Sequence, residues 1–410
     1  MKKDKKTNKK KQKKWILRRH KIVRDIVGIF FGPIVRRKYG VKVQPFTEGA
    51  GKQYLVLYNH QTAYDQFFVG LAFPGAVYYV ASEDIFSMGW VSKLIRFLVN
   101  PIPIKKQTTD PRAVINCIKV AREGGTIAIA PEGNRTYSGA PAYIKPAIAS
   151  LARHLGLPIA IFRIEGGFGV HPRWSDVVRD GAMTAGVSRV IEPEEYKELD
   201  DGALAQLIER ELNVNEARSD RTYESEHLAE YIERAMYVCP ECGLSEFESH
   251  GDVVKCKKCG LAVRYMPNTE LCGVDSPFPY KYLSEWYDYQ CDYVNSLNTL
   301  DLTSDPVYED DVQMSEVILY KKKTIVCKSA KISLYGDRVV LKNGDQEYTV
   351  FFDDISAMSV LGKNKLNLYT GSNVYQFKGN ERFCALKYVN LYYRYKNIRK
   401  GDENVKFLGL

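Results

Sequence analysis

Long apolar runs are missing from the N-terminal part of this 410-residue chain. The apolar stretch at residues 26–35 is about ten residues long and is interrupted by Gly28, Gly32 and Pro33, whereas a membrane-spanning helix needs about 20 residues. This stretch therefore cannot cross a bilayer. We expect no secretory signal either, because charged residues interrupt the apolar region and no small-residue cleavage site follows. The chain also lacks internal repeats and long low-complexity segments beyond a lysine-rich start.

Acidic residues are scarce at the N-terminus. The formal net charge is +10, and residues 1–14 contribute +8 through nine Lys and one Asp. Residues 15–40 contribute a further +6 through seven Lys or Arg and one Asp, which leaves −4 for the rest. The basic character thus belongs to the first 40 residues. Because residues 1–14 have almost no apolar content, we expect them to be a disordered polybasic tail.

Residues 15–40 place apolar side chains at helical intervals among basic ones. The apolar positions are Ile22, Val23, Ile26, Val27, Phe30 and Ile34. A basic amphipathic helix behind a polybasic tail is typical of a peripheral anchor on anionic lipid. We therefore expect residues 1–40 to hold the chain on the cytoplasmic face of a membrane. A tail that binds nucleic acid, or nothing, is the alternative, and we do not expect a nucleic-acid partner.

Two short polar segments each follow an expected buried strand. Residues 59–65 (NHQTAYD) come after the apolar run 54–58, and residues 131–135 (PEGNR) come after the run 126–130. Both runs are short and rich in β-branched or aromatic residues, as buried strands are. Open α/β sheets gather their ligands where strands end. A histidine, a carboxylate, a Gly-centred turn and an arginine can therefore converge in one crevice.

These residue types suit acyl transfer. His60 could remove a proton from an acceptor hydroxyl, and such a general base contributes roughly 10²–10⁴-fold. Residues 62–73 are expected to form a helix with Asp65 about one turn inside it, close enough to orient the imidazole and stabilise the imidazolium. If the acceptor hydroxyl attacks the thioester directly, no nucleophilic Ser or Cys is needed.

The same segments resemble the PlsC-type glycerolipid acyltransferase family over about residues 41–215. The family's first block is Asn-His, four residues and Asp, and it is matched by Asn59, His60 and Asp65. The third block is Pro-Glu-Gly-Thr-Arg, and it is matched by Pro131, Glu132, Gly133 and Arg135, with Asn134 in place of Thr. At the second block, the run 102–104 leads into Lys105 and Lys106, where the family usually has Arg. The fourth, residues 157–162, keeps one of two prolines.

The resemblance implies a glycerol-3-phosphate acyltransferase-like α/β domain over residues 41–235, with strands flanked by helices. It implies catalysis by His60 and Asp65. The acyl group would move from acyl-CoA or acyl-carrier protein to the free hydroxyl of 1-acylglycerol 3-phosphate, giving phosphatidic acid. Another lysolipid acceptor remains open, as does an inactive fold that serves as a lipid- or nucleic-acid-binding adaptor. The presence of both catalytic residues argues against the last.

Substrate binding is expected at the same blocks. Lys and Arg both bind phosphate, so we expect Lys105, Lys106 and Arg135 to hold the acceptor phosphate. A carboxylate would repel phosphate, and Glu132 is therefore expected to contact a hydroxyl or to brace Arg135. The remaining expected substrate-binding residues are Asn59, Gly133 and Asn134.

Four of the nine cysteines have the spacing of metal ligands. Two Cys-x2-Cys pairs, each followed by glycine, lie thirteen residues apart; their members are Cys239, Cys242, Cys256 and Cys259. Four thiolates at this spacing suit tetrahedral zinc and resemble a zinc ribbon, here residues 236–266. The closed ligand set indicates a structural site. Disulfides are the competing use, although the expected cytosolic side favours reduced thiols. The other five are expected only to pack; they are Cys117, Cys272, Cys291, Cys327 and Cys384.

The C-terminal part changes from helical to period-two patterning. Residues 267–312 are expected to be an aromatic-rich helical linker, with Trp286 on a helix that packs a core. Strands are predicted at 317–320, 325–327, 338–341, 348–352, 366–369 and 374–377, separated by turns such as Asn343-Gly344. A helix over 381–395 should close the segment. Antiparallel strands followed by one helix resemble, in topology alone, a pleckstrin-homology or GRAM-like domain over 313–400.

Overall fold

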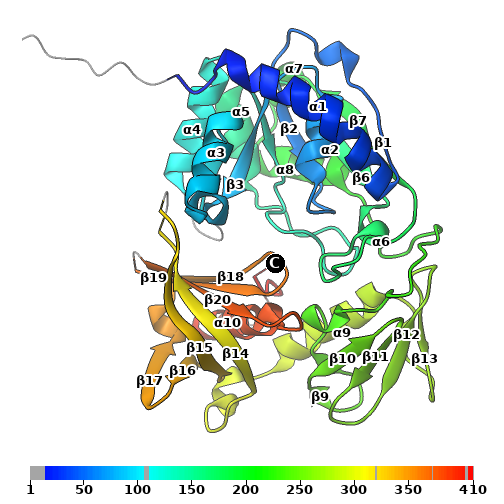
Figure 1. Ribbon diagram of the computed structural model, residues 1–410, viewed down its shortest axis with the longest axis vertical. Helices are drawn as coiled ribbons and strands as arrows, with labels where there is room; N and C mark the ends of the chain where they lie inside the picture. Colours follow the sequence, from blue (N-terminus) through cyan, green and yellow to red (C-terminus); the bar gives the residue numbers. More distant parts are fainter. Residues whose placement is uncertain (1–13, 106–109, 319–320, 372, 402–404, 410) are drawn as a thin grey trace, which may run out of the picture.

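The structure, a computed structural model, describes residues 14–105, 110–318, 321–371, 373–401 and 405–409 (Figure 1). Lys106 and the expected disorder of residues 1–13 lie outside the described residues. The fold class is confirmed: an α/β domain is followed by a four-cysteine segment and an antiparallel β half-barrel.

A seven-stranded mixed sheet forms the centre of the N-terminal domain, in the order β1-β7-β6-β2-β5-β3-β4. Its strands are β1 (Val41–Val43), β2 (Leu55–Tyr58), β3 (Val77–Ser82), β4 (Ile102–Ile104), β5 (Thr126–Ile129), β6 (Ile159–Glu165) and β7 (Met183–Ile191). Neighbours run parallel except β6 and β7. All four residues of β2 are buried, as expected for a central strand covered on both faces.

Helices cover both faces of this sheet and create two separate cores. One core joins α1 (Arg18–Tyr39) and α2 (Asp65–Ala72) to the face that carries Val56 and Ala128. The other joins α4 (Pro111–Arg122), α5 (Ala147–Leu155) and α8 (Asp201–Leu212) to the face that carries Leu57 and Ile127. The other described helices of this domain are α3 (Trp90–Leu98), α6 (Gly167–Val170) and α7 (Pro193–Tyr196).

Helix α2 begins later than the sequence indicated. Asp65 is its first residue, so the expectation that Asp65 lies one turn inside a helix over 62–73 is wrong. The reason is local: the Asp65 carboxylate accepts hydrogen bonds from the backbone N–H groups of Gln61 and Thr62, which holds the preceding residues in a turn.

Helix α1 packs only part of its surface against the domain. His20, Val35 and Tyr39 are buried, whereas a row of large apolar side chains remains exposed: Ile22, Ile26, Ile29, Phe30, Phe31 and Ile34. The segment before α1 is also tied down, because the Glu123 carboxylate accepts hydrogen bonds from the backbone N–H groups of Trp15 and Ile16. Within the described residues, no helix is both long and apolar enough to cross a membrane.

The four-cysteine segment is built from short antiparallel strands. These are β8 (Val238–Cys239), β9 (Gly243–Leu244), β10 (Phe247–His250), β11 (Val253–Cys256), β12 (Ala262–Tyr265) and β13 (Leu271–Gly273). Helix α9 (Leu283–Ser296) follows and inserts Trp286, which is fully buried and donates its indole N–H to the Val238 carbonyl.

The half-barrel is a seven-stranded antiparallel sheet in the order β17-β16-β15-β14-β20-β19-β18. Its strands are β14 (Tyr308–Glu316), β15 (Thr324–Leu334), β16 (Arg338–Asn343), β17 (Gln346–Phe351), β18 (Ala357–Leu361), β19 (Lys365–Thr370) and β20 (Asn373–Gly379), and α10 (Ala385–Arg399) packs on β18 and β19. The predicted strand at 317–320 is wrong for residues 317–318, which follow the end of β14 at Glu316; residues 319–320 lie outside the described residues. The sequence also missed β18.

The half-barrel faces the N-terminal domain (Figure 1), and side chains of the two parts bind one another. Tyr369 donates a hydrogen bond to Glu83, and Lys323 forms an ion pair with Asp84; both acids lie in the 3-10 helix η2 (Glu83–Ser87). The hydrophobic core of the C-terminal part also reaches into the N-terminal domain, where it includes Trp174. The two domains therefore form one packed body.

Candidate active site

The two polar segments identified in the sequence lie at the carboxyl ends of neighbouring strands. Strand β2 ends just before Asn59 and His60, and β5 ends shortly before Glu132. The two strands pair in parallel, with Leu57 opposite Ile129. The shared register brings the two polar segments to one edge of the sheet.

His60 and Asp65 form a hydrogen-bonded dyad. The imidazole Nδ1 lies 2.7 Å from Oδ2 of Asp65, whose side chain is fully buried, while the His60 side chain is about a quarter exposed. Besides His60, the carboxylate accepts hydrogen bonds from the backbone N–H of Gln61 (2.7 Å) and from the N–H (2.8 Å) and hydroxyl (2.7 Å) of Thr62. Since the carboxylate can only accept, it holds the proton of neutral His60 on Nδ1 and leaves the lone pair on Nε2.

Asn59 positions the end of β2. Its side-chain N–H donates to the Ile164 carbonyl (2.8 Å), and its side-chain oxygen accepts from the Ile164 backbone N–H (2.8 Å). Both polar groups of this buried amide are thus engaged with β6. The sequence interpretation made Asn59 a substrate-binding residue, whereas these bonds give it a positioning role next to His60.

Glu132, which follows β5, supports the backbone of His60. Its Oε1 accepts a hydrogen bond from the backbone N–H of His60 (3.0 Å). The expectation was a contact to a substrate hydroxyl or to Arg135. Burial raises the pKa of this carboxyl to about 8, the N–H groups of His60 and Ala142 act in the opposite direction, and the Asp65 carboxylate adds to the rise. Glu132 is therefore largely protonated at neutral pH.

Gly133 and Asn134 complete the turn that leads into Arg135. Gly133 has φ 69°, a left-handed conformation that favours glycine, and its N–H closes the turn on the Ala130 carbonyl (3.0 Å). Gly133 is exposed, whereas Asn134 is 5% exposed and lies below the surface of the turn.

Arg135 is buried close to the dyad. It is 9% exposed, and its Nη1 is buried without a hydrogen-bond partner among the described residues. Burial and then the neighbouring Arg173 lower the pKa of Arg135 to about 10, while Asp65 acts in the opposite direction. A buried guanidinium nitrogen without a partner is costly, so this position is suited to receive an anion.

Further basic side chains that the sequence interpretation missed gather around Arg135. Arg173 is 3% exposed, donates to the Arg135 carbonyl (3.1 Å) and lies 4.3 Å from the centre of the Tyr137 ring. His171 is buried, and its Nε2 has no hydrogen-bond partner among the described residues. Burial, together with the charges of Arg135, Lys363 and Lys38, lowers the pKa of His171 to about 3, which keeps the imidazole neutral.

The half-barrel contributes a further cation, Lys363, near Arg135 and His171. Lys363 lies in the turn between β18 and β19 and forms an ion pair with Asp176 (2.5 Å), which Arg234 also binds (2.9 Å). Burial opposes the effect, but the hydrogen bonds from Arg234 and Lys363 lower the pKa of Asp176 to about 2. Arg173 also donates to the Val360 carbonyl of β18 (3.4 Å). The C-terminal domain thus closes one side of the basic cluster that Arg135, Arg173, His171 and Lys363 form.

Lys105 is not brought to this cluster by the sheet. It follows β4, the edge strand, which is separated from β5 by β3. Its backbone N–H donates to the Asp110 carboxylate (3.1 Å), which also caps α4. Lys106 lies outside the described residues. The polar segment after β6 contains His171 and Arg173, which the sequence interpretation did not consider.

The four expected metal ligands meet in one cluster. The Sγ atoms of Cys239, Cys242, Cys256 and Cys259 all lie within 4.8 Å of one another. The Sγ atoms of Cys239 and Cys259 are 3.6 Å apart, as are those of Cys242 and Cys256, too far for a disulfide of about 2.05 Å; all nine cysteines are free. Four sulfur atoms so arranged can hold a metal ion of tetrahedral preference. Among the other cysteines, Cys272 is exposed, so the expectation that it only packs is wrong.

Part of the first domain matches a known protein family. Residues 37–164 match the protein-family model described as Acyltransferase. The first domain is an acyltransferase domain. The crystal structure of the 1-acyl-sn-glycerophosphate (LPA) acyltransferase PlsC from Thermotoga maritima is also similar, at 20% sequence identity and a TM-score of 0.39. The match covers 46% of this chain and 77% of that one, and a likeness of this size decides no substrate.

Proposed function

We propose that this chain transfers a fatty acyl group from an acyl thioester, acyl-CoA or acyl-carrier protein, to the free hydroxyl of 1-acylglycerol 3-phosphate, giving phosphatidic acid. The observation that carries the proposal is the His60–Asp65 dyad, in which four donors bind one buried carboxylate. Beside it lies Arg135, whose buried Nη1 has no hydrogen-bond partner among the described residues. The dyad supplies a base, and the arginine supplies an anion site.

The reaction needs one attack and one proton relay. Nε2 of His60 takes the proton of the acceptor hydroxyl as its oxygen attacks the thioester carbonyl carbon. Asp65 stabilises the imidazolium that forms, since the two atoms are 2.7 Å apart. The C–S bond then breaks, the thiol leaves with the proton from His60, and the products are an ester and a free thiol.

The acceptor phosphate binds in the basic cluster defined by Arg135, Arg173, His171 and Lys363. Arg135 offers its buried Nη1, and neutral His171 can offer a hydrogen bond from Nε2. Charge-assisted hydrogen bonds to phosphate are among the strong ones in proteins. Lys363 adds charge at the rim while it stays paired with Asp176.

The decisive experiment is a substrate screen. Purified protein is mixed with acyl-CoA and a panel of lysolipids, and products are identified by mass spectrometry. We expect acylation of the phosphate-bearing lysolipid over lysolipids with a neutral or zwitterionic headgroup. Preferential use of another lysolipid would move the proposal to that acceptor. The absence of any acylated product with every donor would favour an inactive, lipid-binding adaptor.

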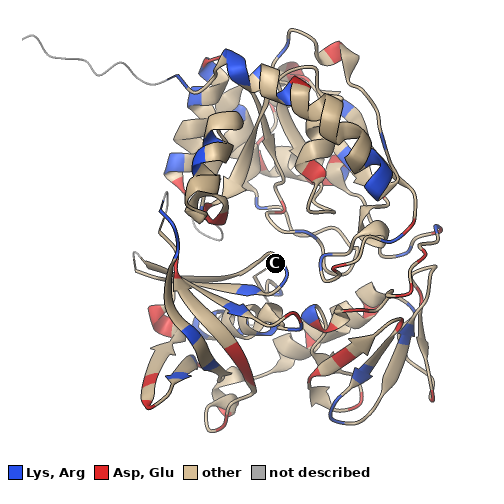
Figure 2. Cartoon of the chain, viewed as in Figure 1, with Lys and Arg blue, Asp and Glu red and all other residues tan. Residues whose placement is uncertain are grey.

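The acyl acceptor resides in a bilayer, and the exposed apolar row of α1 supports a peripheral location at its cytoplasmic face. Lys and Arg gather toward the two ends of this helix (Figure 2). The four-cysteine cluster holds a structural zinc ion in this proposal, since thiolates suit zinc and no ligand position is left for catalysis. The half-barrel with its closing helix α10 is proposed to be a PH- or GRAM-like domain on topology alone.

A further inference from the structure

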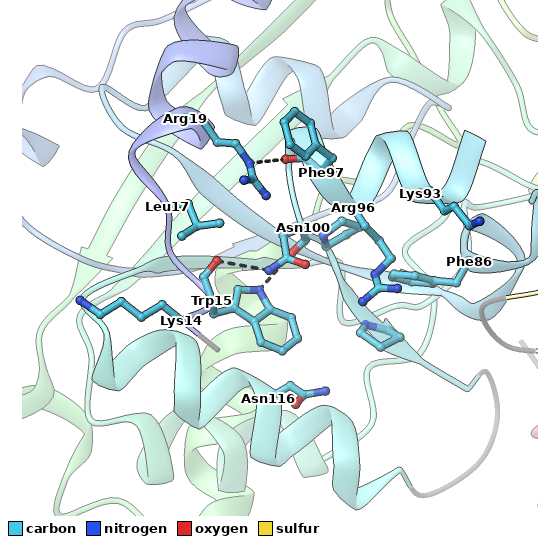
Figure 3. A pocket seen from close by; sticks show the side chains of 12 residues that line it. Lys14, Trp15, Leu17, Arg19, Phe86, Lys93, Arg96, Phe97, Asn100 and Asn116 are labelled. Carbon is cyan, nitrogen blue, oxygen red and sulfur yellow. Dashed lines mark hydrogen bonds between the residues drawn. The ribbon is translucent and has the colours of Figure 1, made fainter. Parts of the chain in front are cut away.

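A pocket apart from the catalytic dyad lies between the start of α1, helix α3 and helix α4 (Figure 3). It has a volume of about 440 Å³, within the range of roughly 300–1,000 Å³ that is typical of ligand pockets. Pro101 and Pro103 on either side of Ile102 in β4 line it. Since β5 and β3 separate β4 from β2, this pocket does not belong to the site around His60.

The lining is basic and aromatic. Its cations are Lys14, Arg19, Lys93 and Arg96, its aromatic rings are Trp15, Phe86 and Phe97, and none of the described residues that line it is acidic. Two acids close to the pocket have hydrogen-bond or ion-pair partners. Glu123 accepts from the backbone N–H groups of Trp15 and Ile16, and Asp84 of η2 is paired with Lys323.

Several contacts build the pocket. Arg19 donates from Nε to the Phe97 carbonyl (2.8 Å), and its guanidinium lies 4.0 Å from the centre of the Phe97 ring. Trp15 donates its indole N–H to the Asn100 carbonyl (3.0 Å), and the Asn100 side chain donates to the Trp15 carbonyl (3.2 Å). Figure 3 shows the side chains of Arg19, Trp15 and Asn100 gathered near the centre of the pocket. These contacts fix Arg19 against Phe97 and Trp15 against Asn100.

Two exposed apolar rows begin at this pocket. On α3, the exposed side chains of Trp90, Leu94 and Phe97 lie one turn apart, and Phe97 also lines the pocket. On α1, Arg19 precedes Ile22 by one turn in the row of exposed apolar residues, and α1 contacts α3. Apolar rows flanked by cations favour the boundary between headgroups and acyl chains of an anionic bilayer.

We propose that this pocket binds the phosphate headgroup of an anionic phospholipid, while the apolar rows of α1 and α3 enter the acyl-chain boundary. The guanidinium groups of Arg19 and Arg96 are offered to the phosphate, while Lys14 and Lys93 extend to opposite sides of the pocket (Figure 3) and add positive charge around it. A site of this kind orients the acyltransferase domain on the membrane, whichever acceptor it acylates. The inference therefore stands apart from the proposed reaction.

The test uses the full chain and the fluorescence of Trp15. The ligand is short-chain phosphatidylglycerol below its micellar concentration, and short-chain phosphatidylcholine, inorganic phosphate and CoA are the comparison ligands. We expect a saturable change with phosphatidylglycerol that is absent in Trp15→Phe. Equal saturation by inorganic phosphate, or saturation by CoA alone, would replace the lipid by a free anion or by the acyl donor and overturn the proposal.

A charge-matched pair of variants separates a site from a diffuse attraction. Lys93→Ala/Arg96→Ala removes two cations from the pocket, and Arg36→Ala/Arg37→Ala removes two exposed cations from the far end of α1. The pocket variant should lose affinity for phosphatidylglycerol by at least about tenfold, because two cations that can bind the phosphate are removed. The α1 variant should keep the short-chain response within about twofold. Equal losses in both variants, or no loss in the pocket variant, would refute a specific site.

Discussion

Asp65→Asn tests how the buried carboxylate controls His60. In the native site, Oδ2 faces the His60 Nδ1 and the Gln61 N–H, while Oδ1 faces the N–H and hydroxyl of Thr62. An asparagine has one oxygen and one NH2 group for these four donors. If its NH2 group faces His60, it donates to Nδ1, and the imidazole proton moves to Nε2, where the base is needed.

The opposite orientation of the asparagine has a different cost. Its oxygen then preserves the bond to His60, but its NH2 group faces the Thr62 N–H, which loses its acceptor inside a fully buried site. An unsatisfied buried N–H costs about 1–3 kcal/mol. The first orientation stops base catalysis, and the second destabilises the turn. We therefore expect kcat to fall on the order of 10²–10⁴-fold.

Steady-state release of free thiol from acyl-CoA measures this fall, and denaturant unfolding measures the loss of stability. Thr62→Val is the matched control, because it removes one donor to Oδ1 and leaves the bond between Asp65 and His60 in place. It should lower stability while kcat changes only several-fold. A folded Asp65→Asn protein whose kcat stays within a few-fold of the parent would refute this reasoning.

Three further predictions concern the surrounding groups. Arg135→Ala should raise KM for the phosphate-bearing acceptor by about 10- to 150-fold, the equivalent of roughly 1.5–3 kcal/mol, with little change in KM for the donor. Lys363→Ala should raise the acceptor KM by less. Equal effects on the KM of both substrates would contradict a role of Arg135 in binding the phosphate. Glu132 has a pKa of about 8 in the folded chain and binds more protons there than in the unfolded chain, so the free energy of unfolding should fall as pH rises from about 4.5 to 8. Denaturation of Glu132→Gln at several pH values should lack this slope. An unchanged slope would contradict the raised pKa of Glu132. Elemental analysis should find one zinc ion per chain, lost in Cys239→Ser/Cys242→Ser, whereas a metal-free native protein with four oxidised thiols would establish disulfides instead.

Local patterns in the sequence predicted what local chemistry determines. His60 and Asp65 meet, as their spacing indicated, and so do the four cysteines of the two Cys-x2-Cys pairs. Each of the two polar segments follows a strand, as the sequence predicted. The start of α2 was wrong because hydrogen bonds to one side chain, Asp65, outweigh the helical periodicity of the residues before it. Periodicity describes burial and does not record such competing bonds.

Tertiary contacts determined the rest. Strand β14 contains Glu309, Asp310 and Asp311, which disfavour strands, and its pairing with β15 and β20 overrides that preference. All five residues of β18 are buried, so the alternation that marks a half-exposed strand is missing. Lys363 reaches Asp176 only because the half-barrel packs on the acyltransferase domain. His171 and Arg173, by contrast, follow β6, and the rule that identified His60 could have found them.

The central claim is that His60 acts as the base in acyl transfer to a phosphate-bearing lysolipid. The most direct measurement compares the parent chain with His60→Ala in the mass-spectrometric assay, using acyl-CoA and 1-acylglycerol 3-phosphate. We predict phosphatidic acid from the parent and a rate lower by about 10²–10⁴-fold from a folded variant. A folded His60→Ala protein that forms phosphatidic acid at nearly the parent rate would contradict the account.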